Sequence, residues 1–242
     1  MVRYDQGAHS RAKLGFVLLA SEQTIEDDLM RMRPAGVGVH FTRVRNSDTI
    51  TVDTLRAMRQ GLADAASLIA PEAGLNVVCY ACTSGSVVIG EDEVIAELGR
   101  GAPHARATTL VTGVVEGLRA LEARRIVVGT PYLDEINAIE RDFLERKGFE
   151  ILAFEGLNIR LDTDIVRVSP KFIYEFARAL DKPDADAIFI SCGALRTLEV
   201  IQDIEAALGK PVVASNQAMM WHCLRLAGIG DRLERYGRLF QH

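Results

Sequence analysis

The sequence predicts an α/β fold of two pseudo-symmetric Rossmann-like domains with parallel sheets and an active site in the interdomain cleft. Apolar strand-like runs alternate with helical patterns along the chain, which is typical of right-handed βαβ units. Landmarks of the first half also recur after a constant offset of 110 residues (192 − 82 = 110). The landmark pairs are Leu18 and Val128 at strand ends, Gly38 and Gly148 at strand starts, and Cys82 and Cys192. A duplicated unit explains this shared offset.

The first half is expected to run strand, helix, strand, helix in a regular order. The expected elements are strand 13–20, helix 24–33, strand 38–44, helix 53–69, strand 76–82, helix 86–98, strand 107–111 and helix 112–123. The first helix carries Glu26, Asp27 and Asp28 in its first turn, where acidic side chains are favourable. The second helix places Leu55 and Leu62 on one apolar face.

The second half repeats this order. The expected elements are strand 125–130, helix 132–147, strand 149–154, helix 170–180, strand 186–191, helix 195–208, strand 211–214 and closing helical segments. Thr130-Pro131 and Ser169-Pro170 are good N-cap and N1 pairs for two of these helices. The last helices are expected to cross back to the first domain. The predicted domains are therefore 1–111 plus 216–242, and 112–215.

Composition excludes several classes of protein. A net charge of −5 and a pI near 5.6 argue against a nucleic-acid surface, which needs a basic stripe. No apolar run reaches the roughly 18 residues that a membrane span needs, and the polar N-terminus lacks a signal-peptide apolar region. We expect a cytoplasmic protein. Four cysteines in a chain of 242 residues do not make a disulfide framework, and Cys79 and Cys223 are predicted to be small core residues.

Cys82 and Cys192 each end an apolar strand, where open α/β proteins place ligands. Each is followed by small residues and a helical pattern, so we expect backbone N–H groups and the positive end of a helix to favour thiolate. Thr83 and Ser84 add hydroxyl groups after the first thiol, and Gly193 after the second lets a ligand approach the backbone closely. This pattern indicates a small-anion cradle with one reactive thiol on each side of the substrate.

The sequence favours chemistry without a cofactor or metal. It contains no zinc-type Cys/His spacing, no P-loop, no Gly-x-Ser-x-Gly elbow and no complete dinucleotide loop. Two thiols around a small carboxylate suit proton transfer at the carbon next to the carboxylate, with preorganised donors stabilising the negative charge that develops. The expected partner is a small carboxylate substrate, with no nucleic acid and no membrane.

These motifs resemble the aspartate/glutamate racemase superfamily, in which two α/β domains each supply one cysteine to a cleft. Within it, the chain is similar to the branch of maleate cis–trans isomerases, arylmalonate decarboxylases and ectoine-utilization protein A. The segment from Ser191 to Leu198 is very like the second-cysteine segment of the decarboxylases. The resemblance implies that Thr83, Ser84, Tyr132 and Gly193 hold the carboxylate or enediolate, that Cys82 and Cys192 are catalytic, and that the protein forms a homodimer.

The chain also departs from each member of this branch. Decarboxylases have glycine at the first cysteine position, so Cys82 favours racemase or isomerase chemistry. Maleate isomerases use two asparagines; here Gln23 is the nearest substitute for the first, and the counterpart of the second falls near Asp162-Thr163-Asp164. The resemblance therefore favours an ectoine-utilization-type racemase of a small carboxylic or amino acid. The alternatives are a maleate-type isomerase with a covalent cysteine adduct, an arylmalonate-type decarboxylase using Cys192, and a non-catalytic protein that binds small anions.

Overall fold

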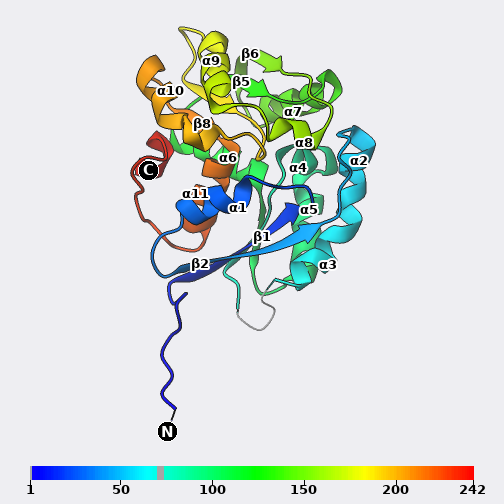
Figure 1. Cartoon of the computed structure of the whole chain (residues 1–242), viewed down its shortest axis with the longest axis vertical. Helices are drawn as coiled ribbons and strands as arrows, with labels where there is room; N and C mark the ends of the chain where they lie inside the picture. The colour runs from blue at the N-terminus through cyan, green and yellow to red at the C-terminus, as the bar shows by residue number, and fades with distance from the viewer. Residues whose placement is uncertain (1, 70–73) are drawn as a thin grey trace.

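The computed structural model describes residues 2–69 and 74–242, which form two four-stranded parallel sheets (Figure 1). The strand orders are β2-β1-β3-β4 and β6-β5-β7-β8, so the two halves have the same topology. The strands are β1 (Ala12–Leu19), β2 (Val37–Val44), β3 (Val77–Tyr80), β4 (Arg106–Thr109), β5 (Arg125–Thr130), β6 (Glu150–Gly156), β7 (Ala187–Ile190) and β8 (Val212–Ala214). The predicted α/β class with two parallel sheets is confirmed, and β3 and β7 keep the predicted offset (187 − 77 = 110).

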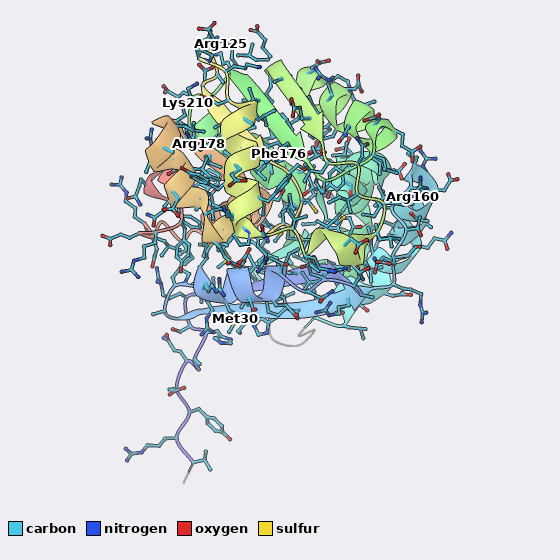
Figure 2. The ribbon with its side chains drawn as sticks, turned by 45° about the horizontal axis from the view of Figure 1, so that its top comes forward. Met30, Arg125, Arg160, Phe176, Arg178 and Lys210 are labelled. Carbon is cyan, nitrogen blue, oxygen red and sulfur yellow. The ribbon has the colours of Figure 1, made fainter. Side chains whose placement is uncertain are left out.

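Helices cover both faces of each sheet. In the first half these are α1 (Ile25–Arg31), α2 (Val52–Ala57), η1 (Met58–Gly61), α3 (Leu62–Ser67), α4 (Thr83–Ile89), α5 (Glu91–Gly101) and α6 (Leu110–Ala120). In the second half they are α7 (Asp134–Arg146), α8 (Asp162–Ile165), α9 (Pro170–Leu180), η2 (Thr197–Glu199), α10 (Ile201–Leu208), α11 (Ser215–Leu226) and η3 (Arg238–Gln241). Figure 2 shows Met30 on the outer side of α1 and Phe176 and Arg178 on α9, which marks the two outer helical layers.

Three predicted helices differ from the observed ones. The helix expected over 86–98 is two helices, α4 and α5, because Gly90 lies between them at φ +102° and cannot continue an α-helix. The helix expected over 53–69 is interrupted by the 3₁₀ turn η1. The helix expected from residue 195 begins only at Ile201, after a turn and η2. The chain from Cys192 to Val200 therefore forms a loop.

Two features join the halves. Helix α6 leads from the first sheet to the second and packs against α11 at Gly113, where a Cβ would lie 3.0 Å from the Ala218 carbonyl oxygen. On the opposite side, residues 46–51 pair with residues 158–163, and we call these two segments the strap. In the strap, Ile50 N–H donates to the Arg160 carbonyl at 3.1 Å and Asp162 N–H donates to the Asp48 carbonyl at 2.9 Å. The strap thus links the β2–α2 connection to the β6–α9 connection.

The predicted division into 1–111 plus 216–242 and 112–215 stays a prediction. It agrees with the membership of the two sheets, but α6 and α11 contact both of them. None of the helices formed by residues 2–69 and 74–242 has the length and apolar character needed to cross a membrane.

Candidate active site

One pocket lies where the carboxyl ends of the two sheets meet. Both halves contribute to its wall. The first half contributes Leu19 at the end of β1, Glu22 after it, Asn46, Ser47, Thr49 and Ile50 of the strap, Thr54, Leu55 and Met58 of α2 and η1, and Ala81 to Ser84 after β3. The second half contributes Tyr132, Asp162 and Cys192 to Ala194. The structure therefore brings together the predicted residues Cys82, Thr83, Ser84, Tyr132, Cys192 and Gly193.

Cys82 is the N-cap of α4, in extended conformation directly after β3. Its Sγ accepts a hydrogen bond from Gly85 N–H at 3.2 Å and lies 3.7 Å from Ser84 Oγ. The thiol is only 7% exposed. Burial raises its pKa to about 11, against the lowering effect of these two hydrogen bonds. The expected helix-terminus stabilisation of the thiolate is present, but desolvation outweighs it.

Cys192 has a different environment from Cys82. Its backbone is in the left-handed region at φ +102°, which is strained for a residue with a Cβ. No α-helix follows it directly, so the predicted effect of a helix terminus on this thiol is wrong, whereas the predicted backbone donor is present, because the Ala194 N–H group hydrogen-bonds to Sγ and lowers the pKa. Burial raises its pKa well above the usual range, and the Asp162 carboxylate adds to this rise. The Tyr132 hydroxyl hydrogen-bonds to Cys192 Sγ and partly opposes it.

The turn at Cys192 is held by the start of α11. Cys192 N–H donates to Ser215 Oγ at 3.0 Å, and Asn216 Nδ2 donates to the Gly193 carbonyl at 2.8 Å. Ser215 Oγ also lies 3.0 Å from Thr83 Oγ1, so one hydroxyl bridges the two cysteine loops. A Cβ on Gly193 would lie 2.7 Å from Ile25 Cδ1, so this glycine is required for packing against α1 as well as at the pocket.

Tyr132 is fixed by a buried polar network. Its N–H donates to Thr130 Oγ1 at 3.2 Å, and its carbonyl accepts from Asn137 Nδ2 at 3.1 Å. Behind it, Glu140 on α7 is fully buried and accepts a hydrogen bond from the Ser191 hydroxyl at 2.7 Å. Burial raises the pKa of Glu140 to about 7. Its second oxygen has no hydrogen-bond partner among the residues that the structure describes.

The pocket also contains two acidic residues that the sequence did not predict, Glu22 and Asp162. Gln23, predicted to bind substrate, is exposed and does not line the pocket, whereas its neighbour Glu22 does. Glu22 Oε1 accepts hydrogen bonds from the first N–H groups around α1 and therefore turns inward. Sequence signals for both acids existed, because Glu22 adjoins Gln23 and Asp162 lies in the stretch singled out in the second half. The sequence did not show which side chain faces inward.

Cys79 and Cys223 are buried and not disulfide-bonded, as predicted for core residues. Within residues 2–69 and 74–242, no group of three or more His, Cys, Asp or Glu side chains is arranged to hold a metal ion.

The chain matches a model of a known protein family. A family model described as arylmalonate decarboxylase matches residues 47–240. The chain belongs to this family. The predicted branch of the aspartate/glutamate racemase superfamily is thereby confirmed.

Characterised relatives of this family member carry out two different reactions. An arylmalonate decarboxylase of Bordetella bronchiseptica is 38% identical over 144 residues, which cover 58% of the chain and 60% of the decarboxylase. The alignment therefore spans less than two thirds of that enzyme. A maleate isomerase of Nocardia farcinica is 29% identical over 241 residues and 95% of both chains.

Solved structures give the same picture of the fold. A maleate isomerase of Pseudomonas putida S16 superposes with a TM-score of 0.86 over 95% of this chain and 98% of that one, at 22% identity. A variant of the Nocardia farcinica isomerase, with one cysteine replaced by serine, carries a covalently bound succinylcysteine intermediate. It has a TM-score of 0.86 at 27% identity, over 95% of this chain and 98% of that one. These relatives are isomerases and a decarboxylase, so they favour the two alternatives over the ectoine-utilization-type racemase.

Proposed function

We propose that this protein is a cofactor-independent isomerase of a small carboxylic acid, in which Cys82 and Cys192 both act on the bound substrate. The observation that carries the proposal is the presence of two free thiols, from equivalent strand ends of the two halves, in the wall of one pocket. Thr83 and Ser84 lie beside Cys82 and are the proposed donors to the substrate carboxylate. Tyr132 is the proposed donor on the side of Cys192, and Gly193 contributes its backbone there.

The difference between the thiols suggests separate roles. Cys82 has the lower pKa and is the N-cap of α4, so we assign it as the nucleophile. Its thiolate adds to a carbon–carbon double bond, and the displaced electron pair passes to the neighbouring carboxylate. Rotation about the resulting single bond and expulsion of the thiolate give the other geometric isomer. Cys192, which stays protonated, can deliver a proton to the intermediate carbanion and take it back.

The covalent route draws support from the succinylcysteine intermediate of the related maleate isomerase variant. The decarboxylase reaction is the second candidate, supported by the 38% identity to an arylmalonate decarboxylase. In that reaction Cys192 alone would protonate an enediolate after loss of CO₂. The ectoine-utilization-type racemase, the homodimer and the cytoplasmic location stay predictions.

The test compares Cys82→Ser, Cys192→Ser and the matched control Cys79→Ala, which removes a thiol from the core of the first sheet. Each protein is incubated with maleate, with an arylmalonate and, in D₂O, with single enantiomers of small amino acids. We expect isomerisation to fall at least about 100-fold in both serine variants and to change less than about twofold in the control. We also expect intact-mass analysis to show an adduct on Cys82 in the Cys192→Ser protein.

Other results would select other functions. CO₂ release that survives loss of Cys82 but not of Cys192 would select the decarboxylase. Solvent deuterium at an sp³ α-carbon without any adduct would select racemisation. Unaltered activity in both serine variants would refute every one of these functions.

A further inference from the structure

We propose that the substrate is a small carboxylic acid whose second polar group is an ammonium group, and that Asp162 accepts the hydrogen bond from that group. This inference rests on the proposed function, because it takes Thr83 and Ser84 as the carboxylate-binding side of the pocket. It identifies Asp162 as the residue that determines substrate specificity.

The described part of the pocket wall contains acidic side chains and no basic ones. Among the described residues, the lining contains the carboxyl groups of Glu22 and Asp162 and no lysine, arginine or histidine. Glu22 comes from the β1–α1 connection and Asp162 from the start of α8, so both halves contribute one acid. A dicarboxylate would place its second negative charge against these two acids without a lysine, arginine or histidine of the lining to compensate it, so we expect it to bind more weakly than an acid whose second group is an ammonium group.

The Glu22 side chain occupies the N–H groups at the beginning of α1, where a second carboxylate of the substrate could otherwise bind. Its Oε1 accepts hydrogen bonds from the backbone N–H groups of Gln23, Thr24 and Ile25 at 2.9, 2.6 and 2.9 Å. These N–H groups surround the beginning of α1 and would otherwise be free to bind an anion. The chain's own carboxylate occupies them.

The two carboxylate oxygens of Asp162 differ in their hydrogen bonding. The Ser21 hydroxyl donates to Oδ2, and Ser21 Oγ itself accepts from Asn46 Nδ2 at 2.8 Å, so the orientation of this hydroxyl is fixed. Among the described residues, the side-chain hydrogen bond of Asp162 uses Oδ2 and not Oδ1, and Asp162 is part of the pocket wall. An acceptor in the pocket wall matches an N–H donor on the ligand.

Neither Arg43 nor Arg160 pairs with Asp162. The Arg43 guanidinium is directed to the carbonyls of Leu19 and Glu22 and to the Glu26 carboxylate. Arg160 is exposed, and Figure 2 shows it at the edge of the molecule; only its carbonyl group takes part in the strap. Because the described pocket lining contains no basic side chain, an ammonium group on the ligand would supply the counter-charge for Asp162.

The test uses three acids with the same four-carbon skeleton: butyrate, succinate and 4-aminobutyrate. Calorimetric titration measures their dissociation constants for the wild-type protein, for Asp162→Asn and for Asp164→Asn. Asparagine at 162 still accepts from Ser21 and offers an N–H₂ group to a carboxylate. Asp164 is exposed and pairs with Arg167, so its replacement removes one charge nearby without changing the pocket wall.

We expect the wild-type protein and Asp164→Asn to bind 4-aminobutyrate at least about tenfold more tightly than succinate. We expect Asp162→Asn to lose or reverse this preference. Equal or tighter binding of succinate by the wild-type protein, or a preference unchanged in Asp162→Asn, would overturn the inference while butyrate binding upheld the carboxylate site. Failure of all three acids to bind would refute the carboxylate site itself, and with it the proposed function.

Discussion

Single residues set the chemistry of the two thiols. Cys82 and Cys192 occupy equivalent strand ends, yet one is an extended N-cap residue and the other is in the left-handed region. Each thiol receives a backbone N–H group and a hydroxyl group, from Gly85 and Ser84 at Cys82 and from Ala194 and Tyr132 at Cys192. Burial raises the pKa of Cys192 further than that of Cys82, and the Asp162 carboxylate is its second cause. Duplication therefore kept the positions of the thiols but not their acidity.

The pKa of Cys82 predicts how its reactivity changes with pH. Because this pKa is about 11, the thiolate fraction rises about tenfold per pH unit between pH 7 and 10. We expect the rate of Cys82 alkylation by iodoacetamide to follow that slope and to exceed the rate at Cys192 throughout, as measured by peptide mass mapping. A rate that does not change over this range would contradict the assignment.

Glu140 predicts a pH-dependent stability. Its pKa is about 7 in the folded protein and about 4.3 in an unfolded chain, so the folded state binds more protons between these values. The contribution of Glu140 to stability is therefore fully present below about pH 4 and falls, by the order of 3 kcal/mol, as pH rises to about 7. We expect Glu140→Gln to remove much of this slope in urea unfolding, and Glu135→Gln, at an exposed position on the same helix, to keep it.

The sequence predicted the site residues that lie at strand ends, because strand ends are local features. Cys82, Thr83, Cys192 and Gly193 follow β3 and β7 directly. Asp162 was not predicted to face the pocket, because its orientation depends on Ser21, which is 141 residues away in the chain. Contacts of that kind leave no periodic pattern in the sequence.

At the scale of elements, the strands were predicted more accurately than the helices. Central strands such as β3, β5 and β7 are short runs of mostly apolar residues, so they are visible in the sequence. The breaks in helices depend on backbone conformation. Gly90 separates α4 from α5 at φ +102°, but glycine also occurs inside helices, as Gly99 does in α5.

These two glycines give a matched pair of substitutions. A Cβ at either position would meet no atom within 4 Å, so only the backbone conformation distinguishes them. We expect Gly90→Ala to lower the free energy of unfolding by about 1–3 kcal/mol, because alanine is strained at positive φ. We expect Gly99→Ala to raise it by about 0.5–1 kcal/mol, because alanine favours the helix. Urea denaturation of both proteins tests the expectation; equal effects would refute it.

At the scale of the whole molecule, the strap joins the two halves beside the pocket. Asp48 is central to it, since its carboxylate accepts from Thr163 N–H at 2.9 Å and from the Thr163 hydroxyl at 3.0 Å. The strap residues Asn46, Thr49, Ile50 and Asp162 form part of the pocket wall. We expect a substrate to enter where these segments separate.

Weakening the strap should expose the thiols. Asp48→Ala loses both hydrogen bonds from Thr163, worth about 1 kcal/mol together at an exposed position, so the open state becomes about fivefold more populated. We expect Cys82 alkylation at fixed pH to accelerate by about that factor. Asp164→Ala, which removes an exposed acid paired only with Arg167, should leave the rate unchanged. An equal effect of both substitutions would exclude a gating role for the strap.

The Ser215 hydroxyl, which bridges the two cysteine loops, restricts the substrate analogues that can bind in the pocket. Ser215 accepts from Cys192 N–H, and Thr83 is the one other described residue that its hydroxyl contacts. When Ser215 donates to Thr83, the proton of Thr83 is left to point at the ligand. The Thr83 hydroxyl then donates a hydrogen bond and requires an acceptor atom on the ligand. An ionised carboxylate supplies that acceptor, whereas a primary amide that presents its nitrogen there would be rejected even with an otherwise identical skeleton.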